Sequence, residues 1–81
     1  MAILKEIIYK ANEVADNAER RYGQYASLHE VMGILEEEFL EAKQSLHKSD
    51  WAELRCELID IAAVCLRAAS EKTIRENKNQ I

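Results

Sequence analysis

The sequence predicts an all-α fold, a helical bundle with three main helices in each chain. Its 81 residues include no proline and only two glycines, and good helix formers such as alanine, leucine and glutamate are frequent. Apolar residues recur at helical spacing in three segments separated by short polar stretches. A chain of this length forms one domain, residues 1–81, and buries only about 60% of its unfolded surface. We therefore expect oligomerisation to complete the bundle.

The first predicted helix runs from Ile3 to about Arg21. Its apolar residues recur three or four positions apart, which gives the helix one apolar face. They are Ile3, Leu4, Ile7, Ile8, Ala11, Val14, Ala15 and Ala18. Gly23 follows, and a glycine just past the last periodic residue favours the end of a helix.

The second predicted helix begins after Ser27 and continues to about His47. Ser27 and Glu30 stand three positions apart, which is the pattern of a capping box. Asp50 and Glu53 repeat this pattern and open a third helix. We expect that helix to run from residue 51 to near residue 75.

The third helix is apolar on every side over the stretch from residue 58 to residue 69, except at Asp60 and Arg67. A helix that is apolar all round must be covered all round. Two other helices of the same chain cannot easily cover it. We therefore predict that this helix packs against its own copy in a homodimer or homotetramer.

Composition limits the compartment and the partners. The net charge of −4 argues against a nucleic-acid partner, because a negative surface repels phosphate backbones. The N-terminal apolar stretch contains Lys5, Glu6 and Lys10, so it resembles neither a signal peptide nor a membrane span. Cys56 and Cys65 fall in one predicted helix about 13 Å apart, too far for a disulfide. We expect a cytoplasmic protein with free thiols and no membrane partner.

Two acidic pairs carry the predicted chemistry, Glu38 with Glu41 and Glu57 with Asp60. Residues three apart on a helix share one face, so each pair forms a clamp of two carboxylates. If the second and third helices form an antiparallel hairpin that turns at residues 48–50, Glu41 and Glu57 each lie about 11 to 13 Å from the bend. At a normal interhelical distance of about 8 to 10 Å, the four carboxylates then converge.

Four converging carboxylates require a cation, because like charges and desolvation both oppose their ionisation. The ligand set contains only oxygen and lacks the Glu-x-x-His pattern of carboxylate-bridged iron proteins. This set favours Mg²⁺, or alternatively Mn²⁺, over iron or zinc. Mg²⁺ retains water molecules and binds substrate phosphates, so we expect a nucleotide polyphosphate as substrate. The ion would screen the phosphate charge and orient or activate a water molecule for attack.

The spacing of these acids also resembles that of a known family. Residues 37–41, with the sequence EEFLE, match the EExxE motif of the MazG-like all-α nucleoside triphosphate pyrophosphatases. Residues 57–60, with the sequence ELID, match the ExxD motif that follows it in that family. The resemblance covers about residues 27–70, and the family is itself similar to the dimeric dUTPases.

This resemblance implies a nucleoside triphosphate pyrophosphohydrolase. Such an enzyme converts a nucleoside or deoxynucleoside triphosphate into its monophosphate and pyrophosphate and acts in nucleotide-pool housecleaning. The implied Mg²⁺ ligands are Glu38, Glu41, Glu57 and Asp60. Glu37 and Glu38 are the implied catalytic residues, with Glu37 a candidate for orienting the water or binding a second ion.

Other interpretations of these residues stay open. A run of glutamates such as residues 36–38 is usually solvated surface, and at least one of the three points outward. Asp60 is alternatively a salt-bridge partner of an arginine across an interface. Arg67 shares a face with Asp60 and is a candidate for binding a substrate phosphate, while an ion pair across an interface is the equal alternative.

Two further alternatives concern the place of the aromatic residues and the function of the chain. Tyr22, Tyr25, Phe39 and Trp51 are expected in the core or an interface, although one of them could stack on a base. The alternative function is a non-catalytic helical module that dimerises through its third helix or binds nucleotide without hydrolysing it.

Overall fold

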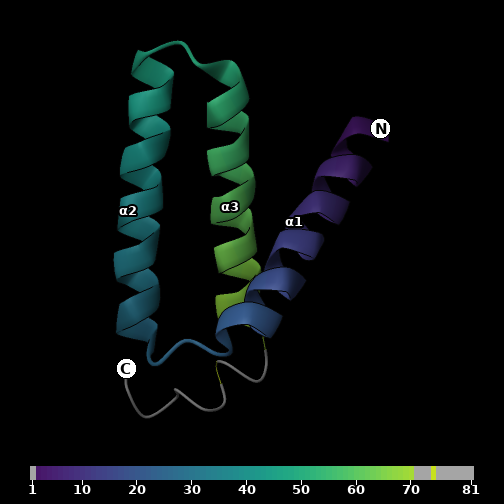
Figure 1. Cartoon of the computed structure of the whole chain (residues 1–81), viewed down its shortest axis with the longest axis vertical. Coiled ribbons are helices and arrows are strands. Elements are labelled where there is room, and N and C mark those ends of the chain that lie inside the picture. The colour runs from purple at the N-terminus through teal and green to yellow at the C-terminus, as the bar shows by residue number, and fades with distance from the viewer. Residues whose placement is uncertain (1, 71–73, 75–81) are drawn as a thin grey trace.

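The computed structural model describes residues 2–70 and residue 74, and every regular element within them is a helix. The helices are α1 (Ala2–Tyr22), α2 (Leu28–His47) and α3 (Trp51–Ala69). Figure 1 shows α2 and α3 side by side as an antiparallel hairpin, while α1 crosses the C-terminal part of α3 and leans away toward its own N-terminus. The predicted all-α, three-helix architecture is confirmed.

The first connection is fixed by a glycine and a capping box. Gly23 has φ 72°, in the left-handed region that favours glycine, and its N–H donates to the carbonyl of Glu19 at 2.9 Å. Ser27 accepts from the N–H of Glu30 at 3.1 Å, as predicted. The Glu30 carboxylate accepts from the N–H of Ala26 at 3.2 Å, so its reciprocal bond reaches one residue before the cap.

The second connection is a tight turn that makes α2 and α3 antiparallel. Ser49 has φ 56°, and the N–H of Asp50 donates to the carbonyl of Ser45 at 2.9 Å. The Asp50 side chain then accepts from the N–H of Glu53 at 3.1 Å and caps α3, as predicted. Because the turn is so short, residues equally far from it on the two helices lie at the same height.

The continuous third helix is shorter than predicted. It ends at Ala69, because Ser70 has ψ 145° and leaves the helical region. We expected it to continue to near residue 75. Residues 71–73 and 75–81 lie outside the part of the chain that the structure describes.

The core lies between α2 and α3 at the end nearest the first connection. Tyr25, Val31 and Val64 form its buried centre, with Leu28, Ile34, Leu35 and Ala68 packed around them. From residue 4 of α1 onward, the buried side chains are the alanines Ala11 and Ala15, which are small enough to let this helix approach α3 closely.

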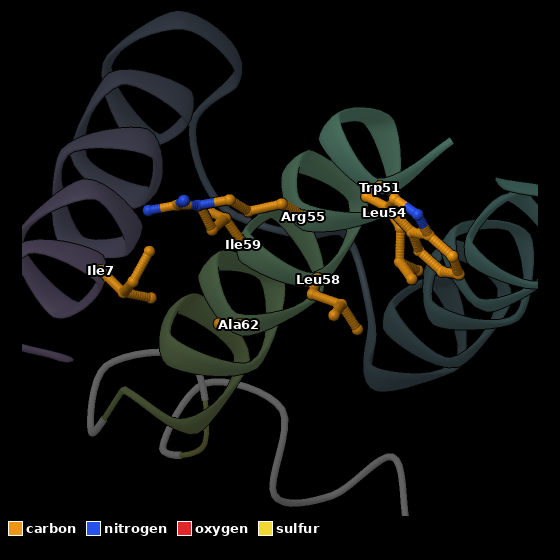
Figure 2. Close-up of a pocket in the computed structure, with 7 residues that line it drawn as sticks. All are labelled: Ile7, Trp51, Leu54, Arg55, Leu58, Ile59 and Ala62. Atoms are coloured by element: carbon orange, nitrogen blue, oxygen red, sulfur yellow. The ribbon is translucent and has the colours of Figure 1, made fainter. Parts of the chain in front are cut away.

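A large apolar surface stays uncovered where α1 diverges from α3. Two adjoining cavities of about 350 and 480 Å³ share Ile7 and Ala62 and form what we term the apolar groove. Figure 2 shows Ile7 of α1 across from Ile59 and Ala62 of α3. Leu58 and Leu66 of α3 are 54% and 46% exposed. As the sequence indicated, the described residues of one chain leave part of α3 without cover.

The structure also bears on the two cysteines and on the apolarity of the helices. Cys56 and Cys65 are free thiols, and both are exposed. None of the helices that the structure describes combines the length and apolarity needed to cross a membrane.

Candidate metal centre

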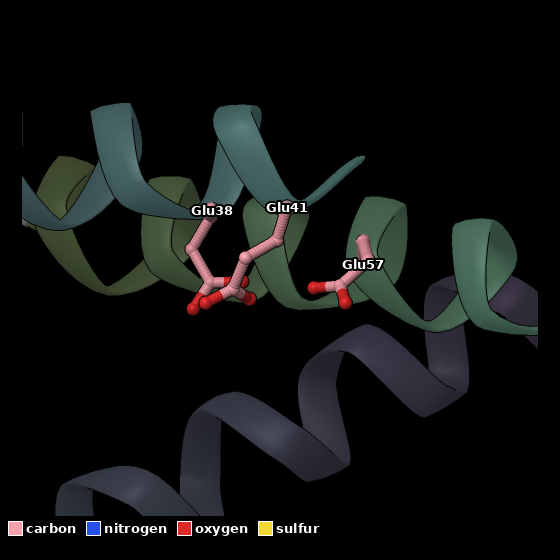
Figure 3. A group of neighbouring side chains, drawn as sticks. All are labelled: Glu38, Glu41 and Glu57. Carbon is pink, nitrogen blue, oxygen red and sulfur yellow. The ribbon is translucent and has the colours of Figure 1, made fainter. Parts of the chain in front are cut away.

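Three of the four predicted carboxylates come together between α2 and α3. One oxygen from each of Glu38, Glu41 and Glu57 lies within 4.8 Å of the others, and we term this group the acidic cluster. Figure 3 shows the carboxylates of Glu38 and Glu41, one helical turn apart on α2, beside that of Glu57 on α3. The short turn places Glu41 and Glu57 at the same level along the two helices. The three-residue spacing places Glu38 on the same face of α2 as Glu41.

Asp60 does not belong to this group of oxygens, although it lies close enough to feel their charge. Burial raises its pKa, with further contributions from Glu41 and Glu53. Its role as a metal ligand stays a prediction. Glu53 is a neighbour that the sequence analysis missed, although it stands four residues before Glu57 and hence one turn away on the same face of α3.

The acidic cluster is electrostatically uncompensated. Glu57 is only 7% exposed, and burial, with contacts to Glu53 and Glu41, raises its pKa to about 7. Burial and the charge of Glu41 also raise the pKa of Glu38, whose Oε2 is buried without a hydrogen-bond partner. Across residues 2–70 and 74, the one ion pair joins Arg67 to Glu19, so no basic side chain neutralises the cluster.

A hard divalent cation fits this donor set. Oxygens bound to one Mg²⁺ at about 2.1 Å lie about 3 to 4.2 Å apart, so oxygens within 4.8 Å need only a small closing movement. All the donors are carboxylate oxygens, which suit Mg²⁺ or Mn²⁺. Glu41 is exposed while Glu57 is buried, which leaves one side of the cluster open for water and phosphate oxygens.

Three consecutive glutamates, residues 36–38, point in different directions, because successive residues of a helix are turned by about 100°. Glu36 and Glu37 are exposed, whereas Glu38 is partly buried and faces the cluster. The expectation that at least one of the three points outward is confirmed. The proposed role of Glu37 in orienting a water molecule stays a prediction.

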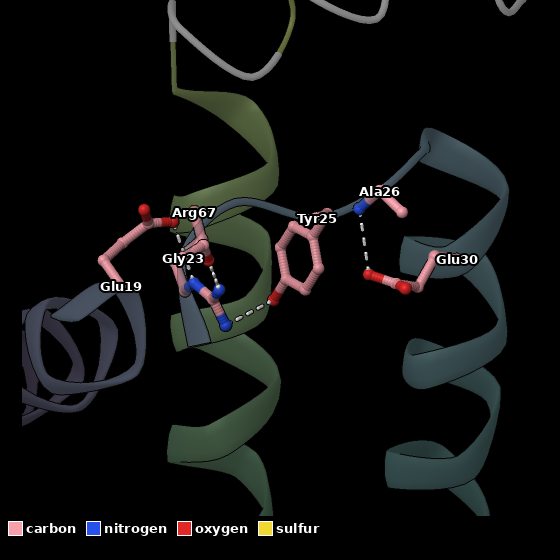
Figure 4. A network of polar contacts seen from close by, with 6 residues as sticks. All are labelled: Glu19, Gly23, Tyr25, Ala26, Glu30 and Arg67. Atoms are coloured by element: carbon pink, nitrogen blue, oxygen red, sulfur yellow. Dashed lines mark hydrogen bonds and ion pairs between the residues drawn. The ribbon is translucent and has the colours of Figure 1, made fainter. Parts of the chain in front are cut away.

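Arg67 is buried in a network that ties α1 and the first connection to α3. Its Nε donates to Oε1 of Glu19 at 3.1 Å, its Nη1 to the hydroxyl of Tyr25 at 3.1 Å, and its Nη2 to the carbonyl of Gly23 at 2.8 Å (Figure 4). The guanidinium also lies 4.2 Å from the centre of the Tyr25 ring, within cation–π range. These partners are more than 40 positions away in sequence, so no local pattern indicates them.

The network bears on the prediction that Arg67 binds a substrate phosphate. All three guanidinium nitrogens already donate within the chain, which uses three of the five N–H groups and leaves one on each terminal nitrogen for a phosphate. The ion pair that the structure contains lies within one chain rather than across an interface. Phosphate binding by Arg67 stays a prediction.

The aromatic residues divide between core and surface. Tyr25 is buried, and burial raises the pKa of its hydroxyl while Arg67 opposes that rise. Tyr22, Phe39 and Trp51 are all more than half exposed. Within the described chain only Tyr25 of these four has its predicted place in the core.

Comparisons with known proteins leave the site to be interpreted from its own geometry. No protein-family model, no curated protein and no solved structure matches this chain.

The raised pKa of Glu57 predicts a pH dependence of stability in the absence of metal. The folded chain holds the Glu57 proton up to about pH 7, whereas the unfolded chain releases it near pH 4.5. The stability from this group is therefore complete at low pH and is lost as pH rises through about 7. In chelator, the free energy of unfolding in urea should fall by about 2 to 3 kcal/mol between pH 5 and pH 8. Glu57→Gln should remove most of this slope, and a wild-type chain that gains stability over this range would contradict the argument.

The Arg67 network predicts a large loss of stability in Arg67→Met. The substitution leaves the Gly23 carbonyl and the buried Tyr25 hydroxyl without their donor, which should cost about 3 kcal/mol in urea denaturation. Arg20→Met is the control, because Arg20 is an exposed arginine of α1 outside the apolar groove and should change stability by less than about 0.5 kcal/mol. Equal effects of the two substitutions would show that the network does not stabilise the fold.

Proposed function

We propose that this chain is the subunit of a Mg²⁺-dependent nucleoside triphosphate pyrophosphohydrolase that acts on ribo- or deoxyribonucleotides in nucleotide-pool housecleaning. The observation that carries the proposal is the acidic cluster, in which a buried carboxylate and its neighbours converge without a neutralising base among the described residues. The resemblance of residues 37–41 and 57–60 to the EExxE and ExxD motifs supports the same reaction.

Each acidic residue has a distinct place in the proposal. Glu38, Glu41 and Glu57 would hold the ion, and Asp60, which lies near enough to feel the charge of Glu41, would complete the set. Bound Mg²⁺, or Mn²⁺, would supply charge neutralisation for the phosphates and activation of water. Glu37 is exposed on α2 next to Glu38, and the proposal assigns it to orienting the attacking water or to binding a second ion.

The proposed reaction breaks one phosphoanhydride bond. The oxygen of water attacks the α-phosphorus, and the bond from that phosphorus to the oxygen bridging to the β-phosphate breaks. Pyrophosphate leaves, the nucleoside monophosphate remains, and the water proton passes to a carboxylate such as Glu38. Arg67 is the candidate to stabilise the departing phosphates, through the N–H groups of its terminal nitrogens that the internal bonds do not use.

A homo-oligomer, as a dimer or a tetramer, is part of the proposal. The apolar groove is lined by side chains of α1 and α3 that water would otherwise hydrate, and a second copy of the chain offers a matching apolar helix. The same surface supports the alternative function, a helical module that dimerises without catalysis. The cytoplasmic location expected from the sequence remains a prediction.

The enzymatic proposal predicts Mg²⁺-dependent release of pyrophosphate from a panel of nucleoside triphosphates. Glu38→Gln and Glu57→Gln should each lower the rate by about 100-fold or more, because each removes a charged ligand of the ion. Glu36→Gln is the matched control, since this glutamate is exposed on the same helix, and its rate should stay within about twofold of wild type. Unchanged activity in both cluster variants would remove the proposed site.

Thermal melting separates the enzyme from the dimerisation module. Millimolar Mg²⁺ or Mn²⁺ should raise the melting temperature of the wild-type chain, and chelator should reverse the rise, because only the folded chain presents the cluster. A chain that responds to the metal without releasing pyrophosphate would favour a degenerate nucleotide-binding module. A chain that does neither would favour the plain dimerisation module.

The oligomeric part of the proposal predicts a wild-type mass of two or four chains in light scattering after size exclusion. Leu66→Glu places a charge in the apolar groove and should shift the mass toward one chain. Leu46→Glu is the matched control, because Leu46 is 51% exposed on α2 and lies outside the groove, so the mass should not change. A wild-type chain that runs as a monomer at micromolar concentration would contradict this part.

A further inference from the structure

A cavity of about 480 Å³ with both polar and apolar walls lies beside the acidic cluster, at the open end of the hairpin, next to the first connection. We term it the turn cavity. Its wall consists of residues 22–26, Glu30, Ile34 and Glu38 of α2, and Val64 and Arg67 of α3. A cavity of this size, with an apolar lining and a few polar groups, is typical of a site for a small organic molecule.

The turn cavity continues directly from the acidic cluster. Glu38 belongs to both, and Glu30, Ile34 and Glu38 stand four residues apart, so they form one stripe along α2. This stripe spans about 12 Å along the helix axis. A molecule whose phosphates lie at the cluster therefore has the cavity as the place for its remaining part.

Two buried polar atoms without hydrogen-bond partners belong to residues in the wall of this cavity. They are Nε2 of Gln24, which is a donor, and Oε2 of Glu38, which is an acceptor. Such atoms are rare in folded proteins, and each requires an explanation. A cation at the cluster satisfies Glu38. A hydrogen-bond acceptor inside the cavity satisfies Gln24, once its terminal amide rotates toward that acceptor.

The backbone on both sides of Gln24 is held in place. The carbonyl of Gly23 accepts from Arg67 at 2.8 Å, the Tyr25 hydroxyl accepts from the same guanidinium, and the N–H of Ala26 donates to Glu30 (Figure 4). The Gln24 amide nitrogen is therefore an unsatisfied donor on a fixed segment of backbone. This arrangement suits recognition, because fixing the segment before binding reduces the entropy lost when the ligand binds.

The apolar groove offers no comparable site for the same molecule. Its lining is mainly aliphatic, with Asn12, Trp51, Arg55 and Cys65 as the exceptions, and it contains no carboxylate. The turn cavity combines carboxylate, amide, hydroxyl and guanidinium groups. A sugar or a base needs such groups to fix its orientation.

We propose that the turn cavity binds the nucleoside part of the substrate and that Gln24 is a specificity-determining residue, whose Nε2 donates to a ring carbonyl of the base. This inference rests on the proposed function for the identity of the ligand. It names the substrate class as nucleotides of uracil, thymine, cytosine or guanine in preference to adenine, which has no carbonyl. A carboxylate at position 24 should narrow or invert the preference for uracil over adenine, because it repels a carbonyl oxygen and can accept from the amino group of adenine.

The test uses uncharged nucleosides in the presence of chelator, so that binding does not depend on the metal. Amide NMR shifts of the wild-type chain are followed during titration with uridine, guanosine and adenosine. We expect shifts at residues 22–26 and along the α2 stripe, with uridine and guanosine bound at least about fivefold more tightly than adenosine. Gln24→Glu should weaken the binding of uridine by about tenfold or more and should narrow or invert the preference for uridine over adenosine.

Gln44→Glu is the matched control, because Gln44 is exposed on α2 outside the cavity and its substitution adds the same charge. Gln24→Leu removes the donor without adding charge. It should weaken the binding of uridine and guanosine and leave the binding of adenosine unchanged. Equal effects of Gln24→Glu and Gln44→Glu, shifts confined to the apolar groove, or no shifts at all would overturn the inference. Pyrophosphate release could persist in each of these cases, and nucleoside binding could persist in a chain without hydrolysis, so the two proposals fail separately.

Discussion

Mutual repulsion between carboxylates is the constraint on which the interpretation of this structure depends. Glu57 is buried beside Glu41 and near Glu38, and no basic side chain of the described residues offsets their charge. Packing of the hairpin forces these groups together, because the same side of α3 that carries Glu57 also carries the core residue Val64 two turns later. Proton uptake or cation binding are the two ways in which the folded chain can relieve this repulsion.

One side of α3 packs inside the chain, and the opposite side lines the apolar groove, as expected from the positions of these residues around a helix. Glu57, Val64 and Arg67 face the interior of the chain, whereas Ala62 and Leu66 lie on the opposite side and line the apolar groove. The acidic cluster and the uncovered apolar surface are therefore on different sides of one helix. An oligomer formed through the groove would leave the open side of the cluster accessible, so catalysis and assembly are compatible.

Arg67 joins α3 to α1 and to the first connection. Its guanidinium holds the first connection through Gly23 and Tyr25 and holds α1 through Glu19, so one side chain fixes both the crossing of α1 and the wall of the turn cavity. Without this interaction, α1 would be fixed to α3 mainly by small residues such as Ala11 and Ala15. The position of the cavity relative to the cluster thus depends on a buried arginine whose partners, Glu19, Gly23 and Tyr25, are distant from it in sequence.

Local patterns in the sequence were enough to determine the three helices, the caps at Ser27 and Asp50, and the equal heights of Glu41 and Glu57, because helix geometry and a short turn fix all of these. Tertiary packing alone decided the rest. It placed Asp60 beyond the three closest oxygens, although helical spacing had paired Asp60 with Glu57 just as it had paired Glu38 with Glu41. It also gave Arg67 internal partners and left Gln24 with an unpaired amide. Such contacts join residues distant in sequence, so no short-range periodicity encodes them.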